Sequence, residues 1–164
     1  MALCIDTKML GTIMPHIQCW FADEQRSILD RGVPLSAAQT QDACLAGIRR
    51  PEQIRLQLVD QLRVHRARLM RKLAPDLELI RPNTKAMTFG YGIYLLRKHQ
   101  NDRPALVHHF VHVAQMEKLG GVNEYIDVYI KNCISFGYAN APLEIQARAV
   151  TARILKNARR VHAA

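Results

Sequence analysis

The sequence predicts an α+β protein that is rich in helix. Two segments, 54–60 and 87–96, have the alternation or the β-branched and aromatic residues that are typical of strands. Three later segments, 104–119, 122–136 and one that begins near 142, repeat apolar residues at helical spacing and are separated by glycine or proline. Strands followed by a run of helices indicate the α+β class, with a small sheet packed on helices.

The first 50 residues are predicted to form a helical or irregular region that packs on the core. Residues 1–20 have a mixed pattern that fits either a loose arm or a short helix. Helical spacing of apolar residues runs from 21 to 29. Ser36 is a predicted N-cap for a second helix, which is expected to end at Gly47.

Residues 51–164 are predicted to carry the sheet and the main helices, and the 164-residue chain is expected to form one compact domain overall. Between the two strand segments, the basic stretch 63–72 is predicted to be a short helix and 77–80 a brief strand. Two glycines interrupt the second strand segment, which indicates a bulge or a close approach of backbones. Asp102 is the predicted N-cap of helix 104–119.

Helix 104–119 contains two histidines with the spacing of metal ligands. His108 and His112 are four residues apart, so both rings are expected on one face of the helix. Two neutral imidazoles one turn apart can bind a metal ion from a single rigid element. Glu144, near the start of the last helix, is the candidate third ligand. The alternative is that the histidines pack between helices without a metal.

The segments around these residues resemble a known family. His108-His-Phe-Val-His112 resembles the zinc-metallopeptidase motif H-E-x-x-H, with His109 in the position of the glutamate. The region 87–148 is similar to small bacterial zincin-like domains of the gluzincin type, in which a later helix carries E-x-x-A, as in Glu144-Ile-Gln-Ala. The resemblance implies a Zn²⁺ cofactor held by His108, His112 and Glu144, and hydrolysis of peptide bonds by zinc-bound water.

His109 is the main departure from this pattern. The motif glutamate transfers a proton from zinc-bound water without ligating the metal. An imidazole differs in reach and charge, and beside a dication it is expected to stay neutral. We retain His109 as a catalytic candidate, together with Tyr138 as a hydrogen-bond donor to an oxyanion. Gln146 and Arg148 stand where related proteins have acidic residues, which removes negative charge near the metal. A catalytically impaired pseudoenzyme that acts through protein contacts is therefore an alternative to an active peptidase.

The glycine-containing segment 89–95 is predicted to be the edge strand on which an extended peptide would pair beside the metal. Tyr91, Gly92 and Tyr94 are the residues predicted to bind this peptide or protein substrate. The alternative is an ordinary core strand in which both tyrosines pack.

The charge balance suggests acidic partners. Lysine and arginine outnumber aspartate and glutamate by 23 to 14, which gives a net charge of +9. Basic clusters at 63–72 and 156–160 make nucleic-acid binding the main alternative from another class, although no known nucleic-acid-binding motif is visible. No apolar run approaches the roughly 20 residues that span a bilayer, and no secretory signal is apparent. With four scattered cysteines and no disulfide framework, we expect a cytoplasmic protein without a membrane span.

Overall fold

The computed structural model describes residues 7–62 and 83–162, and helices lie on both faces of its sheet. In the order in which they pair, the described strands are β1 (Val33–Pro34), β2 (Arg55–Val59), β4 (Gly92–Leu96) and β3 (Ala86–Phe89). Strands β2 and β4 are parallel, whereas β1 and β3 are each antiparallel to their neighbour. Strand β4 is therefore central, and β3 forms one edge of the described sheet.

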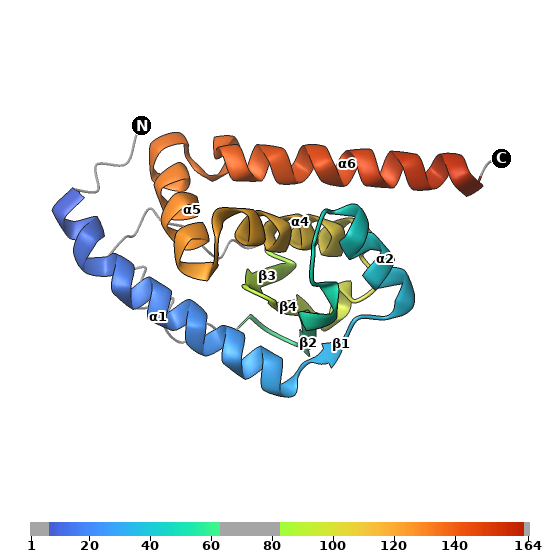
Figure 1. Cartoon of the computed structure of the whole chain (residues 1–164), viewed down its shortest axis with the longest axis horizontal. Coiled ribbons are helices and arrows are strands. Elements are labelled where there is room, and N and C mark those ends of the chain that lie inside the picture. Colours follow the sequence, from blue (N-terminus) through green and yellow to red (C-terminus); the bar gives the residue numbers. More distant parts are fainter. Residues whose placement is uncertain (1–6, 63–82, 163–164) are drawn as a thin grey trace.

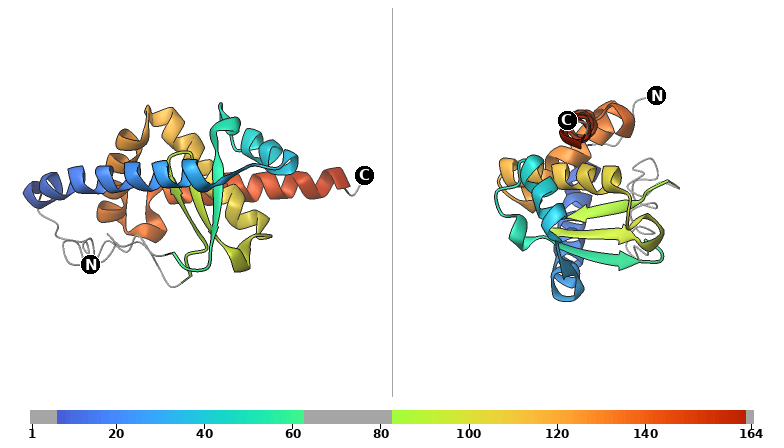
Figure 2. Two further views of the ribbon diagram at one scale, coloured as in Figure 1. Left: turned by 90° about the horizontal axis from the view of Figure 1, so that it is seen from below. Right: turned by 90° about the vertical axis from the view of Figure 1, so that its right-hand side faces the viewer.

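Five helices surround this sheet in the described part of the chain. They are α1 (Thr7–Arg31), α2 (Ala37–Leu45), α4 (Arg103–Leu119), α5 (Val122–Phe136) and α6 (Pro142–His162), with 3₁₀ turns η1 (Pro51–Gln53), η2 (Arg97–His99) and η3 (Tyr138–Asn140). In Figure 1 the sheet lies between α1 and α4, and α6 runs along the far side of α4. Figure 2 shows that α6 extends beyond the body of the molecule. A small mixed sheet covered by helices confirms the α+β class. The predicted basic helix 63–72 and strand 77–80 lie outside the described residues.

The N-terminal region belongs to the same core as the rest of the described chain. Ile13, Ile17 and Trp20 of α1 are buried at helical spacing, in one apolar cluster with Phe110 of α4 and Ile154 of α6. Helix α1 thus begins well before the predicted segment 21–29. For residues 1–20 the sequence left a loose arm or a short helix open, because polar residues and a proline separate the few apolar positions that face the core.

The predicted strand 87–96 is a β-hairpin. Strands β3 and β4 are joined by the two residues Gly90 and Tyr91, and Gly90 has a positive φ of 60°, which favours glycine. A Cβ on Gly92 would lie 2.8 Å from the Cβ of Ile28 in α1. The first glycine therefore makes the turn, and the second lets the sheet lie close to α1.

Helix α4 begins and ends as its sequence predicts. The Asp102 side chain caps it by accepting a hydrogen bond from the Ala105 N–H at 3.0 Å, and Gly120, with φ of 105°, ends it. Arg103 in the first turn donates two hydrogen bonds of 2.8 Å to the buried Asp42 of α2. This bidentate pair fixes the start of α4 against α2.

The last turn of α4 is anchored by Glu117, whose side chain is 1% exposed. Its carboxylate accepts hydrogen bonds from the N–H groups of Arg49 at 2.7 Å and Arg50 at 3.1 Å, and from the Tyr91 hydroxyl at 2.8 Å. Burial alone would raise the pKa of Glu117, but these hydrogen bonds outweigh burial and hold the pKa below its usual value. Glu117 therefore joins the hairpin turn and the segment before β2 to the end of α4.

We expect Glu117→Gln to lower the free energy of unfolding by about 2 kcal/mol at pH 7, because a charged hydrogen-bond acceptor is lost. Since the pKa is lower in the folded protein, the contribution of the carboxylate is complete above the unfolded-state pKa of about 4.3 and is lost as pH falls through the lower folded value. Urea unfolding at several pH values should show the difference from wild type shrinking in acid. Glu52→Gln, at an exposed glutamate, is the control. A difference that does not change with pH would contradict this role.

Candidate metal centre

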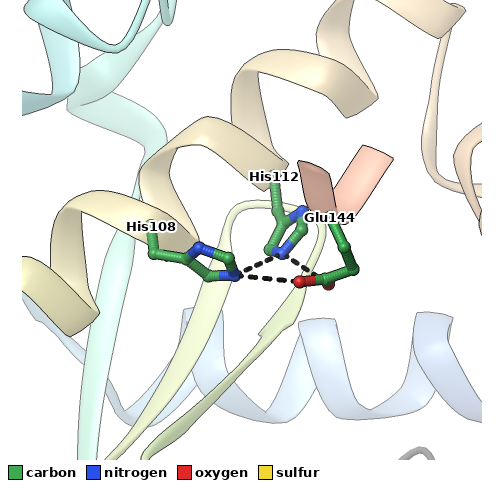
Figure 3. A group of neighbouring side chains, drawn as sticks. All are labelled: His108, His112 and Glu144. Atoms are coloured by element: carbon green, nitrogen blue, oxygen red, sulfur yellow. Dashed lines mark hydrogen bonds and ion pairs between the residues drawn. The ribbon is translucent and has the colours of Figure 1, made fainter. Parts of the chain in front are cut away.

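Two histidines of α4 and one glutamate of α6 point toward a common centre (Figure 3). His112 Nε2 lies 3.0 Å from His108 Nε2 and 3.1 Å from Glu144 Oε1, and His108 Nε2 lies 3.4 Å from Glu144 Oε2. The Glu144 side chain is 1% exposed, and that of His108 is 19% exposed. One ligand atom from each residue lies within 4.8 Å of the others, so the group could hold a metal ion.

The spacing of these atoms is close to that of a metal shell. Ligand atoms about 2.0–2.1 Å from a tetrahedral zinc ion lie roughly 3.3 Å from one another. His112 Nε2 lies 3.0 Å from His108 Nε2 and 3.1 Å from Glu144 Oε1, whereas the 3.4 Å contact of His108 Nε2 is with the other carboxylate oxygen, Oε2. One atom from each residue lies within 4.8 Å of the others, so an ion could be held after rotation of the side chains.

The three ligands meet because α6 packs directly on α4. His108 and His112 are one turn apart on the face of α4 that α6 covers, and Glu144 lies in the first turn of α6. Ala147, on the same face of α6 as Glu144, is fully buried, and its small side chain allows the close approach of the helices. Helical periodicity places the two histidines on one face of α4, whereas the packing of α6 on α4 brings the glutamate to them.

Gln115 fixes the orientation of the His112 ring. Its Nε2 donates to the Leu143 carbonyl at 2.9 Å and to Gln146 Oε1 at 2.8 Å, so its Oε1 is left to accept from His112 Nδ1 at 2.9 Å. With the proton on Nδ1, the lone pair of His112 Nε2 faces the carboxylate of Glu144. Two acceptors 3.1 Å apart repel unless a proton or a cation lies between them, and this tautomer is the one that ligates a metal through Nε2.

Glu144 is a buried carboxylate with incomplete hydrogen bonding. Tyr129 donates to its Oε1 at 2.8 Å, but Oε2 has no hydrogen-bond partner among the described residues. Burial would raise the pKa of Glu144, but when a proton lies on the imidazole nitrogens that face the carboxylate, His108 and His112 outweigh burial and hold this pKa well below the usual range. An ionised, buried oxygen without a hydrogen bond is a group that a cation would stabilise.

His109 lies beside this group without belonging to it. Its Nδ1 is 2.9 Å from the Thr88 hydroxyl, which also lies within 3.4 Å of the His109 carbonyl oxygen. Burial and repulsion from His112 and His108 hold the pKa of His109 well below its usual value, so the ring is neutral at pH 7. If the hydroxyl donates to the carbonyl, Nδ1 carries the ring proton and Nε2 is an acceptor.

A cavity of about 850 Å³ opens beside the three ligands. Strand β3, the first half of α4, and residues of α5, η3 and α6 form its walls. His108, His109, His112, Glu144 and Tyr138 all line it, so the structure brings together the predicted metal and catalytic residues. A substrate in this cavity would contact the metal centre and His109 together.

The residues predicted to bind substrate lie elsewhere. The Tyr91 hydroxyl donates to Glu117, the Tyr94 hydroxyl donates to Glu24 of α1 at 2.9 Å, and Gly92 packs on Ile28. None of the three lines the cavity. The expected edge position of this segment is also wrong, because β2 pairs with the other side of β4. The described edge strand next to the histidines is β3.

Sequence patterns missed two polar partners of the site. The helical pattern of 122–136 places Tyr129 only on an apolar face, and no pattern linked Thr88 to His109. Both contacts join residues from different elements, at distances of 2.8 and 2.9 Å. A tyrosine on an otherwise apolar helix face was the available signal, because a buried phenol needs a hydrogen-bond partner.

No protein-family model, no curated protein and no solved structure matches this chain. Of the two basic clusters, 63–72 lies outside the described residues, and Lys156 of the second is exposed on α6. No helix in the described ranges is both long and apolar enough to cross a bilayer.

We expect Tyr129→Phe to destabilise the metal-free protein by about 1 kcal/mol, because Glu144 loses the hydrogen bond that the Tyr129 hydroxyl donates to its Oε1. Chemical denaturation monitored by circular dichroism measures this loss. Tyr125→Phe is a matched control: Tyr125 is buried on the same helix, and its ring centroid is 5.5 Å from that of Tyr129. Equal effects of the two substitutions would show that the hydrogen bond to Glu144 contributes nothing specific.

Proposed function

We propose that this protein binds zinc through His108, His112 and Glu144, and that the site is of the metallopeptidase type. The observation that carries the proposal is the convergence of two imidazole nitrogens and one carboxylate at 3.0–3.4 Å beside a cavity. Three protein ligands with a fourth position open are the arrangement of catalytic rather than structural zinc sites. Zn²⁺ is accordingly the proposed cofactor, and a peptide the proposed substrate or partner.

The donor set favours zinc over other common cations. Calcium and magnesium prefer shells of oxygen ligands, whereas two imidazoles and one carboxylate suit zinc. The hydrogen bond from His112 to Gln115 supports the proposal, since an oriented second nitrogen is usual for a metal-ligating histidine. The negative charge of the buried Glu144 carboxylate would neutralise part of the positive charge of a bound dication.

Zinc in such a shell supplies a water of lowered pKa as the nucleophile and polarises a carbonyl group. The chain's own residues would hold the peptide. Lys85 O accepts a hydrogen bond from Leu96 N–H, and backbone groups in an antiparallel pair alternate in direction. The backbone groups of Ala86 and Thr88 are thus directed away from β4, toward the edge of the sheet that no other described strand covers. An extended peptide pairing there would lie beside His109.

The rate at which such a site would hydrolyse a peptide depends on His109. A neutral imidazole can accept a proton at Nε2 when its Nδ1 carries the ring proton, which is the case if the Thr88 hydroxyl donates to the His109 carbonyl, but it lacks the negative charge and the reach of a glutamate. We therefore propose slow peptide hydrolysis at most, with peptide binding retained. The limiting case is a pseudoenzyme that acts through protein contacts. Nucleic-acid binding stays a prediction from charge alone, as does the cytoplasmic location.

Elemental analysis of the purified protein should find about one zinc ion per chain. We expect His108→Ala, His112→Ala and Glu144→Ala each to lower zinc affinity at least about 100-fold, because each removes a ligand from a three-ligand site. Zinc at about 100 times its Kd should stabilise the wild type by about 2.7 kcal/mol. His16→Ala, at an exposed histidine of α1, should leave both unchanged. Zinc bound equally by the ligand variants would refute the proposed site.

We expect His109→Glu to cleave a casein or peptide substrate about 100-fold or more faster than the wild type, since a positioned general base contributes 10²–10⁴-fold. Cleavage should stop with a chelator and return with zinc. Slow, chelator-sensitive cleavage by the wild type would identify a peptidase. Cleavage by the variant alone would identify a pseudoenzyme. If zinc-loaded His109→Glu is inactive while folded, the metallopeptidase assignment fails.

A further inference from the structure

The cavity beside the metal centre is lined by an arginine whose carboxylate neighbour is a candidate metal ligand. Among its described lining residues, Glu144 is the one carboxylate, whereas Lys85 and Arg148 are cations. Lys85 is neutralised by Asp102, with 2.7 Å between Nζ and Oδ2. Arg148 lies 3.8 Å from Glu144 and its side chain is 48% exposed. When a dication is bound, the single negative charge of Glu144 cannot neutralise both the metal and the guanidinium group of Arg148. The remaining positive charge favours the binding of an anionic ligand.

Arg148 is placed to meet such a ligand. It follows Glu144 by one helical turn on the same face of α6, and its Nη2 donates to the Ala139 carbonyl, which fixes the guanidinium group. The remaining N–H groups of the planar guanidinium can bind a carboxylate with two parallel hydrogen bonds.

A second polar group lies on the same wall. Thr151, one turn beyond Arg148 on α6, lines the cavity, is 9% exposed, and its Oγ1 has no hydrogen-bond partner among the described residues. Threonine occupies two χ1 rotamers in helices, so rotation about χ1 can turn this hydroxyl toward the cavity. A buried hydroxyl without a partner is satisfied when a ligand supplies an acceptor.

We propose that Arg148 and Thr151 form a subsite for the free C-terminal carboxylate of a bound peptide. This inference rests on the proposed zinc site and names its substrate class. Arg148 Nη1 lies 3.8 Å from Oε2 of Glu144, a candidate metal ligand, so the guanidinium group lies beside the metal position. A peptide carbonyl at the metal position is one residue, a step of about 3.8 Å, from a C-terminal carboxylate, which is then close enough for Arg148 to bind. Peptides with a free C-terminus are the preferred ligands.

The test is a calorimetric titration of the zinc-loaded, full-length protein with two short apolar peptides that differ only at the C-terminus, one a free acid and the other an amide. We expect the free acid to bind at least about 10-fold more tightly than the amide, because its charged carboxylate forms stronger hydrogen bonds with Arg148 than a neutral amide does. Arg148→Met should remove the preference, Arg148→Lys should retain part of it, and Thr151→Val should reduce it. Mass spectrometry confirms that each peptide stays intact during the titration.

The controls separate this inference from the zinc site. Arg153→Met removes an exposed arginine of α6 that does not line the cavity, and it should leave the preference unchanged. Zinc stoichiometry should stay the same in Arg148→Met, because Arg148 is not one of the three ligands and its removal takes away a positive charge that repels the metal. A preference that persists without bound zinc would show that the carboxylate subsite does not depend on the metal, whereas a failure of the zinc site itself would appear in the zinc stoichiometry.

Three results would overturn the subsite. They are equal binding of acid and amide by the zinc-loaded protein, no binding of either peptide, and a full preference in Arg148→Met. An amidated peptide with one internal glutamate that binds as tightly as the free acid would also refute a C-terminal specificity.

Discussion

The packing of α6 on α4 is the interaction on which the candidate site depends. Helix α4 is held at its start by the bidentate pair of Arg103 and Asp42, and at its end by the buried carboxylate of Glu117. Between these two anchors, one face of α4 presents its histidines to α6. Because both ends are fixed, the histidines occupy defined positions before any ligand arrives, which limits the reorganisation needed to bind an ion.

Burying the Glu144 carboxylate in this interface lowers the stability of the fold unless a positive charge lies beside it. A buried carboxylate loses its hydration, and the Tyr129 hydroxyl and the two imidazoles replace only part of it. Gln115 meanwhile turns the lone pair of His112 toward the same carboxylate. In this tautomer, His112 Nε2 and the carboxylate of Glu144 are two acceptors 3.1 Å apart, which a cation between them would satisfy. This local conflict is what favours a binding site over simple helix packing.

Polar side chains from three elements line the cavity. His109 and Thr88 form one wall, Arg148 and Thr151 another, and the edge of β3 that no other described strand pairs with runs beside them. Where H-E-x-x-H has a glutamate, this chain has His109, whose ring is neutral, and the guanidinium group of Arg148 lies near Glu144. In the proposed site, both features would favour the binding of anions over the activation of water.

Local sequence determined the elements of this protein, and tertiary structure decided which residues meet. The caps at Asp102 and Gly120, and the four-residue spacing of His108 and His112, follow from short-range preferences that act within one helix. The resemblance to H-E-x-x-H proteins predicted Glu144 as the third ligand, and the packing of α6 on α4 brings its carboxylate to the two histidines. The central position of β4 depends on its parallel pairing with β2, more than 30 residues away in the chain, which strand patterns do not specify. The same is true of Thr88 beside His109: its hydroxyl reaches the ring only because the sheet packs on α4, and such long-range contacts leave no periodic signal in the sequence.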